Sequence, residues 1–295
     1  MTSDIGWELY RSFLAVLKEG SLSGAARALG VAQPTVGRHV AALEKSLRLA
    51  LFTRSPLGLM PTEAALSLQS FAESMQSTAA ALERAATSQG TGVRGTVRVT
   101  ASDVIGVEVL PPIVAHLRDR HPDLVVELVL TNRVQDLLRR EADIAVRMLR
   151  PRQELLVARR IGRIGVGLHA HQRYLAQHGT PRNLTELAKH SLIGFDQTTA
   201  FIRAAGKAFA SWRREAFAMR TDSDLAQLAL IRSGAGIGAC QAAIARRDAA
   251  LVRILPKQFS LSLQTWITMH EDLRNSPRCR VTFDALVEGL QRHAV

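Results

Sequence analysis

Cysteine is scarce in this chain of 295 residues, and the scarcity excludes several classes of protein. Cys240 and Cys279 form no Cys-x-x-Cys spacing and no cluster with histidine, so the pattern of a zinc site is missing. Two scattered cysteines suit a reducing cytosol better than a disulfide-stapled secreted fold. A redox switch built on these two thiols stays open as an alternative, although ordinary core or surface thiols are commoner.

Long apolar runs are missing as well. No run of about eighteen apolar residues occurs, which argues against a membrane-spanning helix. The segment from Met1 to Trp7 is short and polar, and the first apolar stretch is broken by Arg11 and Lys18, so no secretory signal is predicted. We therefore expect a cytoplasmic protein without a membrane partner.

Motifs that place catalytic groups are also absent. The nine histidines and many carboxylates fall into no GxSxG, HExxH or phosphate-loop pattern. Gly234, Gly236 and Gly238 alternate, but they lack the strand-then-helix context and the distant acid of a dinucleotide site. A packed turn explains these glycines better, so we expect no enzyme, no cofactor and no metal.

The charge favours a polyanionic partner but does not locate its binding site. Lys plus Arg is 38 and Asp plus Glu is 26, a formal net charge of +12. Such a balance is typical of proteins that bind nucleic acid. Up to Thr62, however, seven basic and four acidic residues leave only +3. Most of the excess therefore lies further along the chain.

The length predicts about two domains, and a polar segment, Ser88 to Gly92, marks a boundary between two kinds of pattern. Before it, apolar residues recur at helical spacing up to Gly20, and Ser21 offers a cap for a second helix. Pro34, with its φ already set, suits the start of a third helix that runs to about Leu47. The outward face of that helix carries groups that suit base edges and phosphates. The alternative, that this is only a solvated polar face on a small helical bundle, stays open.

Two extended pieces, 51–54 and 60–62, surround a Pro/Gly turn and predict a β-hairpin. A long helix follows from Thr62 to about Ser88, and its apolar residues alternate spacings of three and four. That pattern predicts a seam between two paired helices, while packing on its own domain is the alternative. The seam residues are Leu68, Phe71, Met75, Thr78, Leu82 and Ala85.

From Val93 onward, strands alternate with helices, which predicts an α/β sheet with crossover connections. The expected strands are 95–100, 124–130, 142–148, 157–169, 192–195, 218–220 and 265–269. The expected helices are 107–120, 134–140, 172–177, 225–232 and 278–293.

Residues 7–64 resemble the LysR-type transcriptional regulators. The resemblance rests on SLSGAARAL at 21–29, VAQPTVGR at 31–38, Leu43-Glu44 and LFTR at 51–54. The order of later elements is similar to the family's effector domain, which resembles periplasmic binding proteins with two subdomains joined by two crossover strands.

The resemblance implies a mixed fold: an α-helical winged helix-turn-helix, a long linker helix and a C-terminal α/β effector domain. We assign 1–62 to the DNA-binding domain, 63–92 to the linker and hinge, and 93–295 to the effector domain. Subdomain I would comprise about 93–161 plus 269–295, and subdomain II about 162–268.

Three residues depart from the family's usual pattern. Ala32 and Gly37 stand where serine is usual, so a helix cap and a hydroxyl at the DNA face are lost, and Gly37 costs about 1 kcal/mol relative to alanine. Arg48 stands where glycine is common. Arginine is strained there if the turn needs a positive φ, and adds a phosphate contact if it does not.

The resemblance implies DNA contacts at the start of the third helix and in the hairpin. Gln33 and Thr35 would read base edges, Arg38 would serve a base or phosphate, and Arg54 would reach the backbone or minor groove. Pro34 would chiefly fix the helix start. The full set is Gln33, Pro34, Thr35, Arg38, His39 and Arg54.

The resemblance also implies a small-molecule effector, such as a small organic acid, between the two subdomains. A helix start at Ser102 would favour a carboxylate, and Arg147 would pair with it. Asp103 and Asp222 argue against a purely anionic ligand, and caps or turns explain several positions equally well. The expected set is Ser102, Asp103, Thr131, Asn132, Arg147, Phe201, Ser223 and Gly236.

The expected partners are double-stranded promoter DNA, the effector, RNA polymerase and further copies of the chain. The resemblance implies a dimer through the linker helix and a tetramer through the effector domains. A redox-responsive regulator of the same fold and a small-molecule binding protein without DNA regulation remain as alternatives.

Overall fold

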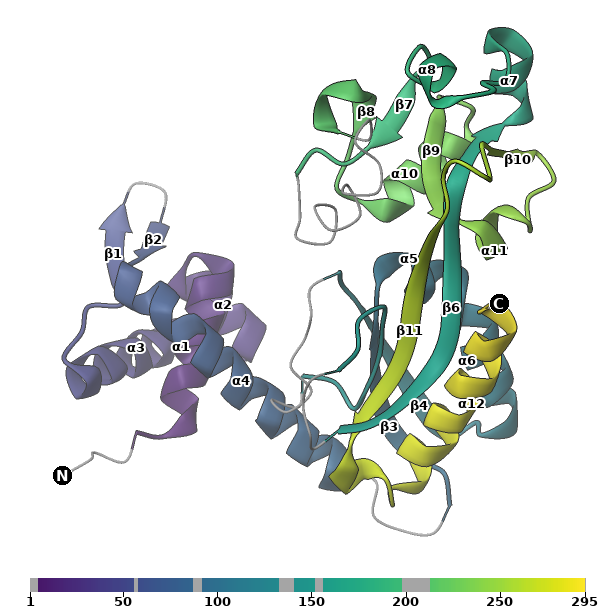
Figure 1. Cartoon of the computed structure of the whole chain (residues 1–295). Coiled ribbons are helices and arrows are strands. Elements are labelled where there is room, and N and C mark those ends of the chain that lie inside the picture. Colours follow the sequence, from purple (N-terminus) through teal and green to yellow (C-terminus); the bar gives the residue numbers. More distant parts are fainter. Residues whose placement is uncertain are drawn as a thin grey trace. The chain divides into compact units, whose positions relative to one another are not determined.

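The structure is a computed structural model that describes residues 5–55, 58–86, 92–132, 141–151, 156–197 and 213–294. It divides into two compact units, the first built on Met1–Ala86 and the second on the chain from Thr87 onward. In Figure 1 the first unit is mostly helical, and the second combines a long sheet with helices.

Three helices form the start of the first unit: α1 (Trp7–Glu19), α2 (Leu22–Leu29) and α3 (Gln33–Leu47). Gly20 and Gly30 end the first two helices with φ of 66° and 67°, left-handed values that glycine adopts without a Cβ clash. The Ser21 hydroxyl accepts a hydrogen bond from the Gly24 N–H and caps α2. These three predicted helices are confirmed.

The hairpin and the long helix are confirmed too. Strands β1 (Phe52–Ser55) and β2 (Gly58–Pro61) pair antiparallel and form the wing. Helix α4 (Glu63–Ala86) begins where the Thr62 hydroxyl accepts from the Ala65 N–H at 3.2 Å. The predicted last residues of this helix lie outside the described residues.

Two long strands organise the second unit. Strand β6 (Leu156–His171) pairs antiparallel with β11 (Leu261–His270), and Figure 1 shows them running together through both halves of the unit. They are the two crossover strands that the resemblance implied. On one side follow the mutually parallel strands β5 (Ile144–Arg147), β3 (Gly95–Ala101) and β4 (Leu124–Leu130).

On the other side of β6 lie β9 (Ile237–Gln241), β7 (Leu192–Gly194) and β8 (Phe217–Arg220), again mutually parallel. Strand β10 (Leu251–Ile254) pairs with the end of β6. The sheet therefore has two parallel portions, which we call subdomains I and II, joined by the β6–β11 ribbon.

Each subdomain has its own apolar core. Helices α6 (Leu110–Arg120) and α12 (Pro277–His293) pack against the sheet of subdomain I, where Leu110, Ile144 and Leu286 are fully buried. The core of subdomain II includes Leu168 and Ile237. Its helices are α7 (Gln172–His178), α8 (Leu184–Leu187), α10 (Asp224–Arg232) and α11 (Ala242–Ala245). Short 3-10 turns occur at Arg214–Ala216 and Glu271–Leu273.

The prediction of one helix over 107–120 is wrong, because the structure has α5 (Asp103–Glu108) followed by α6 from Leu110. Pro111 and Pro112 have no N–H to donate to the preceding turn, so they fit only in the first turn of a new helix. The predicted helix at 134–140 lies outside the described residues. Helices α8 and α11 and strand β10 were not predicted, since four residues are too few to show a period.

Arg48 ends α3 in the left-handed region, with φ 56° and ψ 37°. This settles the open question about Arg48 in favour of strain, since a side chain costs about 1 kcal/mol or more in that conformation.

We expect Arg48→Gly to raise the free energy of unfolding of the N-terminal unit by about 1 kcal/mol, because glycine removes the Cβ clash. The measurement is urea unfolding of the full chain with Trp212 and Trp266 replaced by phenylalanine, so that the fluorescence reports Trp7 alone. Ala42→Gly, on the exposed face inside α3, is the matched control and should lower stability by a similar amount. A lower midpoint for Arg48→Gly would contradict the assignment of strain.

Candidate DNA interface and ligand site

The first turns of α3 present the predicted polar face to solvent. Gln33, Pro34 and Arg38 are exposed, and Thr35 is half-buried. Ala32 precedes the helix and contributes no side-chain cap, so the helix start rests on Pro34 rather than on a hydroxyl. The structure therefore brings four of the six expected DNA-contact residues together at one end of one helix.

His39, the fifth expected contact on α3, forms a hydrogen bond within its own domain. Its Nδ1 lies 2.8 Å from the Ser12 hydroxyl, and Ser12 on α1 is buried. This bond ties α3 to α1, so only the other ring nitrogen is available for DNA. Gly37 is not required by packing, because a Cβ there would meet nothing nearer than a Leu22 methyl at 3.7 Å. Glycine here leaves α3 without a side chain at that point.

Arg54 is exposed on β1, and the wing that carries it is anchored to the helices. One oxygen of the Glu44 carboxylate on α3 accepts from the Leu51 N–H at 2.7 Å and the Phe52 N–H at 3.3 Å. The Leu59 N–H donates to the Gly20 carbonyl at 3.0 Å. Glu44, which appeared in the sequence only as part of a motif, therefore fixes the wing relative to α3.

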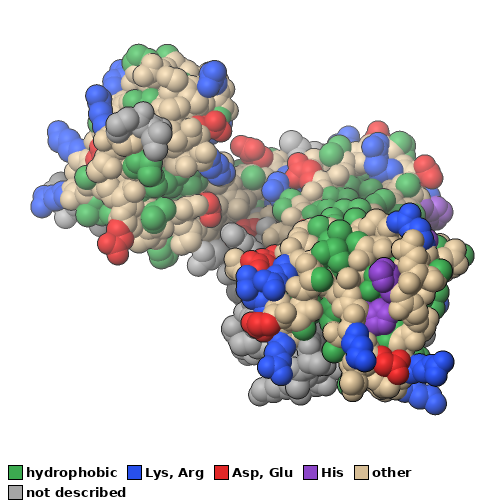
Figure 2. Space-filling view, turned by 90° about the horizontal axis from the view of Figure 1, so that it is seen from above, with side chains coloured by type: hydrophobic (Ala, Val, Ile, Leu, Met, Phe, Trp, Pro, Cys, Tyr) green, Lys and Arg blue, Asp and Glu red, His purple; other side chains and the backbone are tan. Residues whose placement is uncertain are grey.

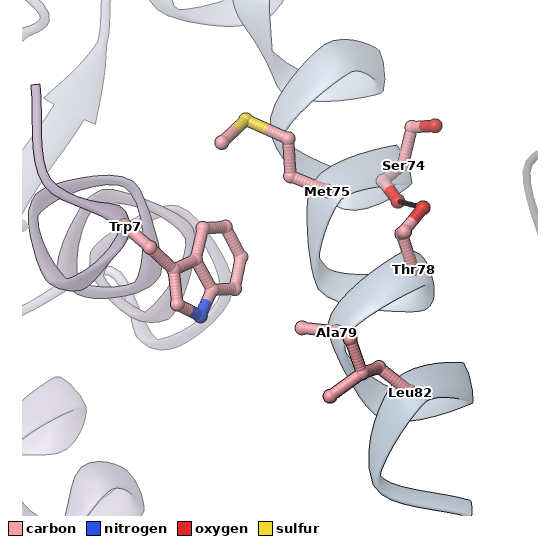
Figure 3. A pocket seen from close by; sticks show the side chains of 6 residues that line it. All are labelled: Trp7, Ser74, Met75, Thr78, Ala79 and Leu82. Atoms are coloured by element: carbon pink, nitrogen blue, oxygen red, sulfur yellow. Dashed lines mark hydrogen bonds between the residues drawn. The ribbon is translucent and has the colours of Figure 1, made fainter. Parts of the chain in front are cut away.

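An apolar groove of about 370 Å³ lies between Trp7 and one face of α4. In Figure 3 the Trp7 ring faces Met75, Ala79 and Leu82 across this groove. Four of the predicted seam residues are exposed, among them Phe71 at 64% and Leu82 at 70%, whereas Leu68 packs against the domain core. The side chain of Ala85 lies outside the described residues.

Four of the expected effector contacts, Ser102, Asp103, Asn132 and Arg147, follow neighbouring strands of subdomain I. The Asn132 side chain accepts from the Asp103 N–H at 3.3 Å and donates to the Asp103 carboxylate at 3.1 Å. The same amide nitrogen donates to Asp224 at the start of α10, at 3.3 Å. Asn132 therefore links the two subdomains.

The charges around Asn132 are mixed. Burial raises the pKa of Asp224, and the neighbouring Asp103 carboxylate raises it further. Burial lowers the pKa of Arg147 to about 10, while Asp103 acts in the opposite direction. Arg147 remains a cation and donates to the Thr100 hydroxyl at 2.7 Å. A partly buried cation and two carboxylates thus lie near one another.

The other expected effector residues have different surroundings. Ser223 caps α10 by accepting from the Ala226 N–H, whereas Ser102 makes no such cap. Gly236 is required by packing, because a Cβ would lie 2.2 Å from the Ser191 carbonyl oxygen. The Thr131 N–H donates to the Ala101 carbonyl. Phe201 lies outside the described residues.

Asp222, singled out with this group, accepts from the Asp196 and Gln197 N–H groups and so shapes a loop. Asp224 was missed by sequence reasoning, although its place directly after Ser223 at a predicted helix start was a usable signal.

The cysteines are poorly suited to redox chemistry. Cys279 is fully buried, and burial raises the pKa of the Cys240 thiol to about 12. The two do not form a disulfide with each other. Within the described ranges, no group of three or more His, Cys, Asp or Glu residues has the arrangement of a metal site, and no helix is long and apolar enough to cross a membrane.

Basic side chains are not confined to the N-terminal unit. In the view of Figure 2, Lys and Arg are spread over both units, in keeping with the excess of charge beyond Thr62. The distribution of charge therefore does not single out one unit, and the candidate DNA interface rests on the exposed side chains of α3 and the wing.

Comparisons with known proteins agree with this architecture. Residues 7–66 match the family described as "Bacterial regulatory helix-turn-helix protein, lysR family", and residues 90–291 match "LysR substrate binding domain". The chain is 29% identical to the HTH-type transcriptional regulator CrgA of Neisseria meningitidis serogroup C, covering 94% of this chain and 95% of that protein. It is 27% identical to the probable regulator LtrA of Klebsiella pneumoniae, covering 94% and 92%.

Solved structures show the same arrangement. The structure of CrgA, a LysR-type transcriptional regulator from Neisseria meningitidis, is 27% identical with a TM-score of 0.60, covering 96% of this chain and 98% of that one. The structure of full-length CbnR complexed with its target DNA has a TM-score of 0.67 at 21% identity, covering 98% and 100%. Since the matched regions span most of the sequence, the chain belongs to the LysR family of transcription regulators, with an N-terminal helix-turn-helix and a C-terminal effector-binding domain.

Proposed function

We propose that this regulator binds double-stranded promoter DNA by placing the start of α3 in a major groove and the wing on the adjacent backbone. The observation that carries the proposal is that Gln33 and Arg38 are exposed, with Thr35 half-buried beside them, on a helix that starts at Pro34 and is bonded to the wing through Glu44. Arg54 would contact a phosphate or the minor groove. The crystal structure of full-length CbnR in complex with its target DNA supports this choice of partner.

The proposed setting is the cytoplasm, where promoter DNA and RNA polymerase are found. We propose regulation rather than catalysis as the role of the whole chain. The boundaries proposed from the sequence, 1–62, 63–92 and 93–295, suit this division of labour, since the described part of α4 lies between the wing and the sheet-bearing unit in the chain.

We propose that α4 pairs two copies of the chain along the seam Phe71, Met75, Thr78 and Leu82. Large exposed apolar side chains gathered along one face are costly unless a partner covers them. Trp7 lies across the groove from this face and would extend the contact. Pairing would place two recognition helices on a roughly two-fold site, and effector domains pairing in turn would give a tetramer.

We propose that a small molecule binds where the starts of α5 and α10 approach each other. Arg147 suits a carboxylate, while Asp103 and Asp224 suit a hydroxyl or ammonium on the same ligand. The proposed contacts are Ser102, Asp103, Thr131, Asn132, Arg147, Phe201, Ser223, Gly236 and Asp224. If the ligand binds one arrangement of the two subdomains more tightly, it would change the fraction of molecules in the conformation that binds DNA.

Footprinting on the DNA upstream of the chain's own gene tests the whole proposal. Protection of a pseudo-two-fold site is expected, and a metabolite that changes the protected pattern would identify the effector. Uniform protection at all sequences, without any discrete site, would contradict sequence-specific binding.

Replacing Arg38 by alanine should weaken binding to the footprinted site by about ten- to a hundredfold, because one base or phosphate contact of about 1–3 kcal/mol is lost. Arg54→Ala should instead reduce the slope of log affinity against log salt by about 1. Both are measured by fluorescence anisotropy over a salt series. Arg292→Ala, which removes the same charge from an exposed position on α12, should leave affinity and slope unchanged.

Placing a charge on the seam should separate the subunits. Leu82→Glu should raise the dissociation constant of the dimer on the order of tenfold or more, because each dimer would bury two carboxylates. Sedimentation velocity over a concentration series measures it. Leu66→Glu is the control, since Leu66 is also exposed on α4 but lies off the seam. Equal dissociation by both variants would argue against the seam.

Removing the buried charge of Asp224 should stabilise the protein at neutral pH. A carboxyl whose pKa is raised on folding contributes stability that is lost as pH rises through the folded value. Asp224→Asn should therefore raise the unfolding temperature at pH 7, by an amount that shrinks as the pH falls through the folded pKa of Asp224. Asp119→Asn, on exposed α6, should show no such trend. A pH-independent gain would indicate a cause other than charge.

A further inference from the structure

Helices α5 and α10 come from different subdomains, yet they touch at both ends. At their N-terminal ends, Asn132 bridges Asp103 and Asp224. At their C-terminal ends, the Arg232 guanidinium forms two hydrogen bonds to the Glu108 carboxylate, at 2.6 and 2.9 Å. The two helices therefore lie side by side and point in the same direction, with their proposed ligand-binding ends together.

The C-terminal contact is a network rather than a single ion pair. Arg247, which follows α11, donates through Nη1 to the main-chain oxygen of Glu108 at 2.6 Å, one of the carbonyls that the end of a helix leaves unpaired. Its Nη2 lies 3.4 Å from Nδ1 of His293 on α12, and Nε2 of His293 lies 3.0 Å from Gln241 on β9.

Charge and burial favour this network. Burial lowers the pKa of His293 to about 4, assisted by Arg247 and Arg246, so the ring is neutral near pH 7. A neutral ring accepts from Arg247 through Nδ1 and donates to Gln241 through Nε2–H. The hydrogen bond from Arg232 lowers the pKa of Glu108, which keeps its carboxylate ionised. The Glu108 side chain is only 17% exposed, so solvent screens the pair less than a surface salt bridge.

We propose that Glu108, Arg232 and Arg247 form a lock that positions the ligand-binding ends of α5 and α10. Helices are stiff, so fixing two parallel helices at one end restricts the separation of their other ends. Glu108 and Arg232 would thus be positioning residues: they contact no ligand, but they set the distance between Asp103 and Asp224. The functional role of the lock rests on the proposed effector site, whereas the contacts that form the lock do not depend on it.

Cysteine cross-linking in the full chain tests the lock without the effector. In the D103C/D224C variant, both new thiols replace side chains that now contact one amide nitrogen, so mild oxidation should join them rapidly. Adding Glu108→Gln should slow formation of this disulfide about fivefold, the effect of losing an interaction of about 1 kcal/mol. Mass spectrometry of the peptide pair distinguishes this link from one to Cys240 or Cys279.

Two further variants separate positioning from general loss of stability. Glu127→Gln breaks the Arg98–Glu127 pair, which lies within subdomain I, and should leave the cross-linking rate unchanged. The E108Q/R232Q double variant should be no slower than E108Q alone, because both changes break one interaction. An unchanged rate in E108Q, or equal slowing by E127Q, would overturn the lock.

The effector site has a separate readout. If E108Q slows cross-linking and also changes the concentration at which a metabolite alters the footprint, both inferences hold. If cross-linking slows while the metabolite response is unaffected, the lock stands and the proposed ligand site is wrong.

Discussion

The antiparallel pairing of β6 with β11 is the constraint on which the second unit depends. Each subdomain contributes parallel strands that need a neighbour, and the ribbon supplies one edge to each portion of the sheet. The buried side chains Ile164 and Ile267 belong to the core of subdomain I, and Leu168 further along β6 belongs to the core of subdomain II. One strand thus carries residues of both cores. The strand registers of the two subdomains are therefore fixed relative to each other.

The β6–β11 ribbon also determines where polar side chains of the two subdomains come together. Because β3, β4 and β5 are parallel, their carboxyl ends lie together, and Ser102, Asn132 and Arg147 gather there. Helix α10 brings Asp224 to the same place from the other subdomain. The polar groups therefore meet where the two portions of the sheet, each with an apolar core, adjoin, and this is the place of the proposed ligand site.

Sequence reasoning anticipated the elements better than their contacts. Gly20, Gly30 and Pro34 act locally, through φ, so their roles in ending or starting helices were readable from the chain. The break at Val109 was misjudged because apolar spacing continued through it, although Pro111 and Pro112 carried the signal. The Asn132–Asp224 and Glu108–Arg232 contacts join residues about a hundred positions apart, and no local pattern encodes such pairs. Gly236 was predicted as a ligand contact, and the close approach of the Ser191 carbonyl, which no local pattern encodes, adds a packing reason for glycine there.

The bonds from Glu44 to the wing have a consequence for genetics. If Arg54 contacts DNA as proposed, the Glu44 carboxylate would contribute to DNA recognition without touching DNA, since it holds the start of the strand that carries Arg54. A screen for lost regulation would therefore recover changes at Glu44 alongside changes at Arg54 and group them as one functional surface. The two kinds of change act differently. A change at Arg54 removes the proposed DNA contact itself, whereas a change at Glu44 leaves Arg54 in the chain but no longer holds it in position for that contact.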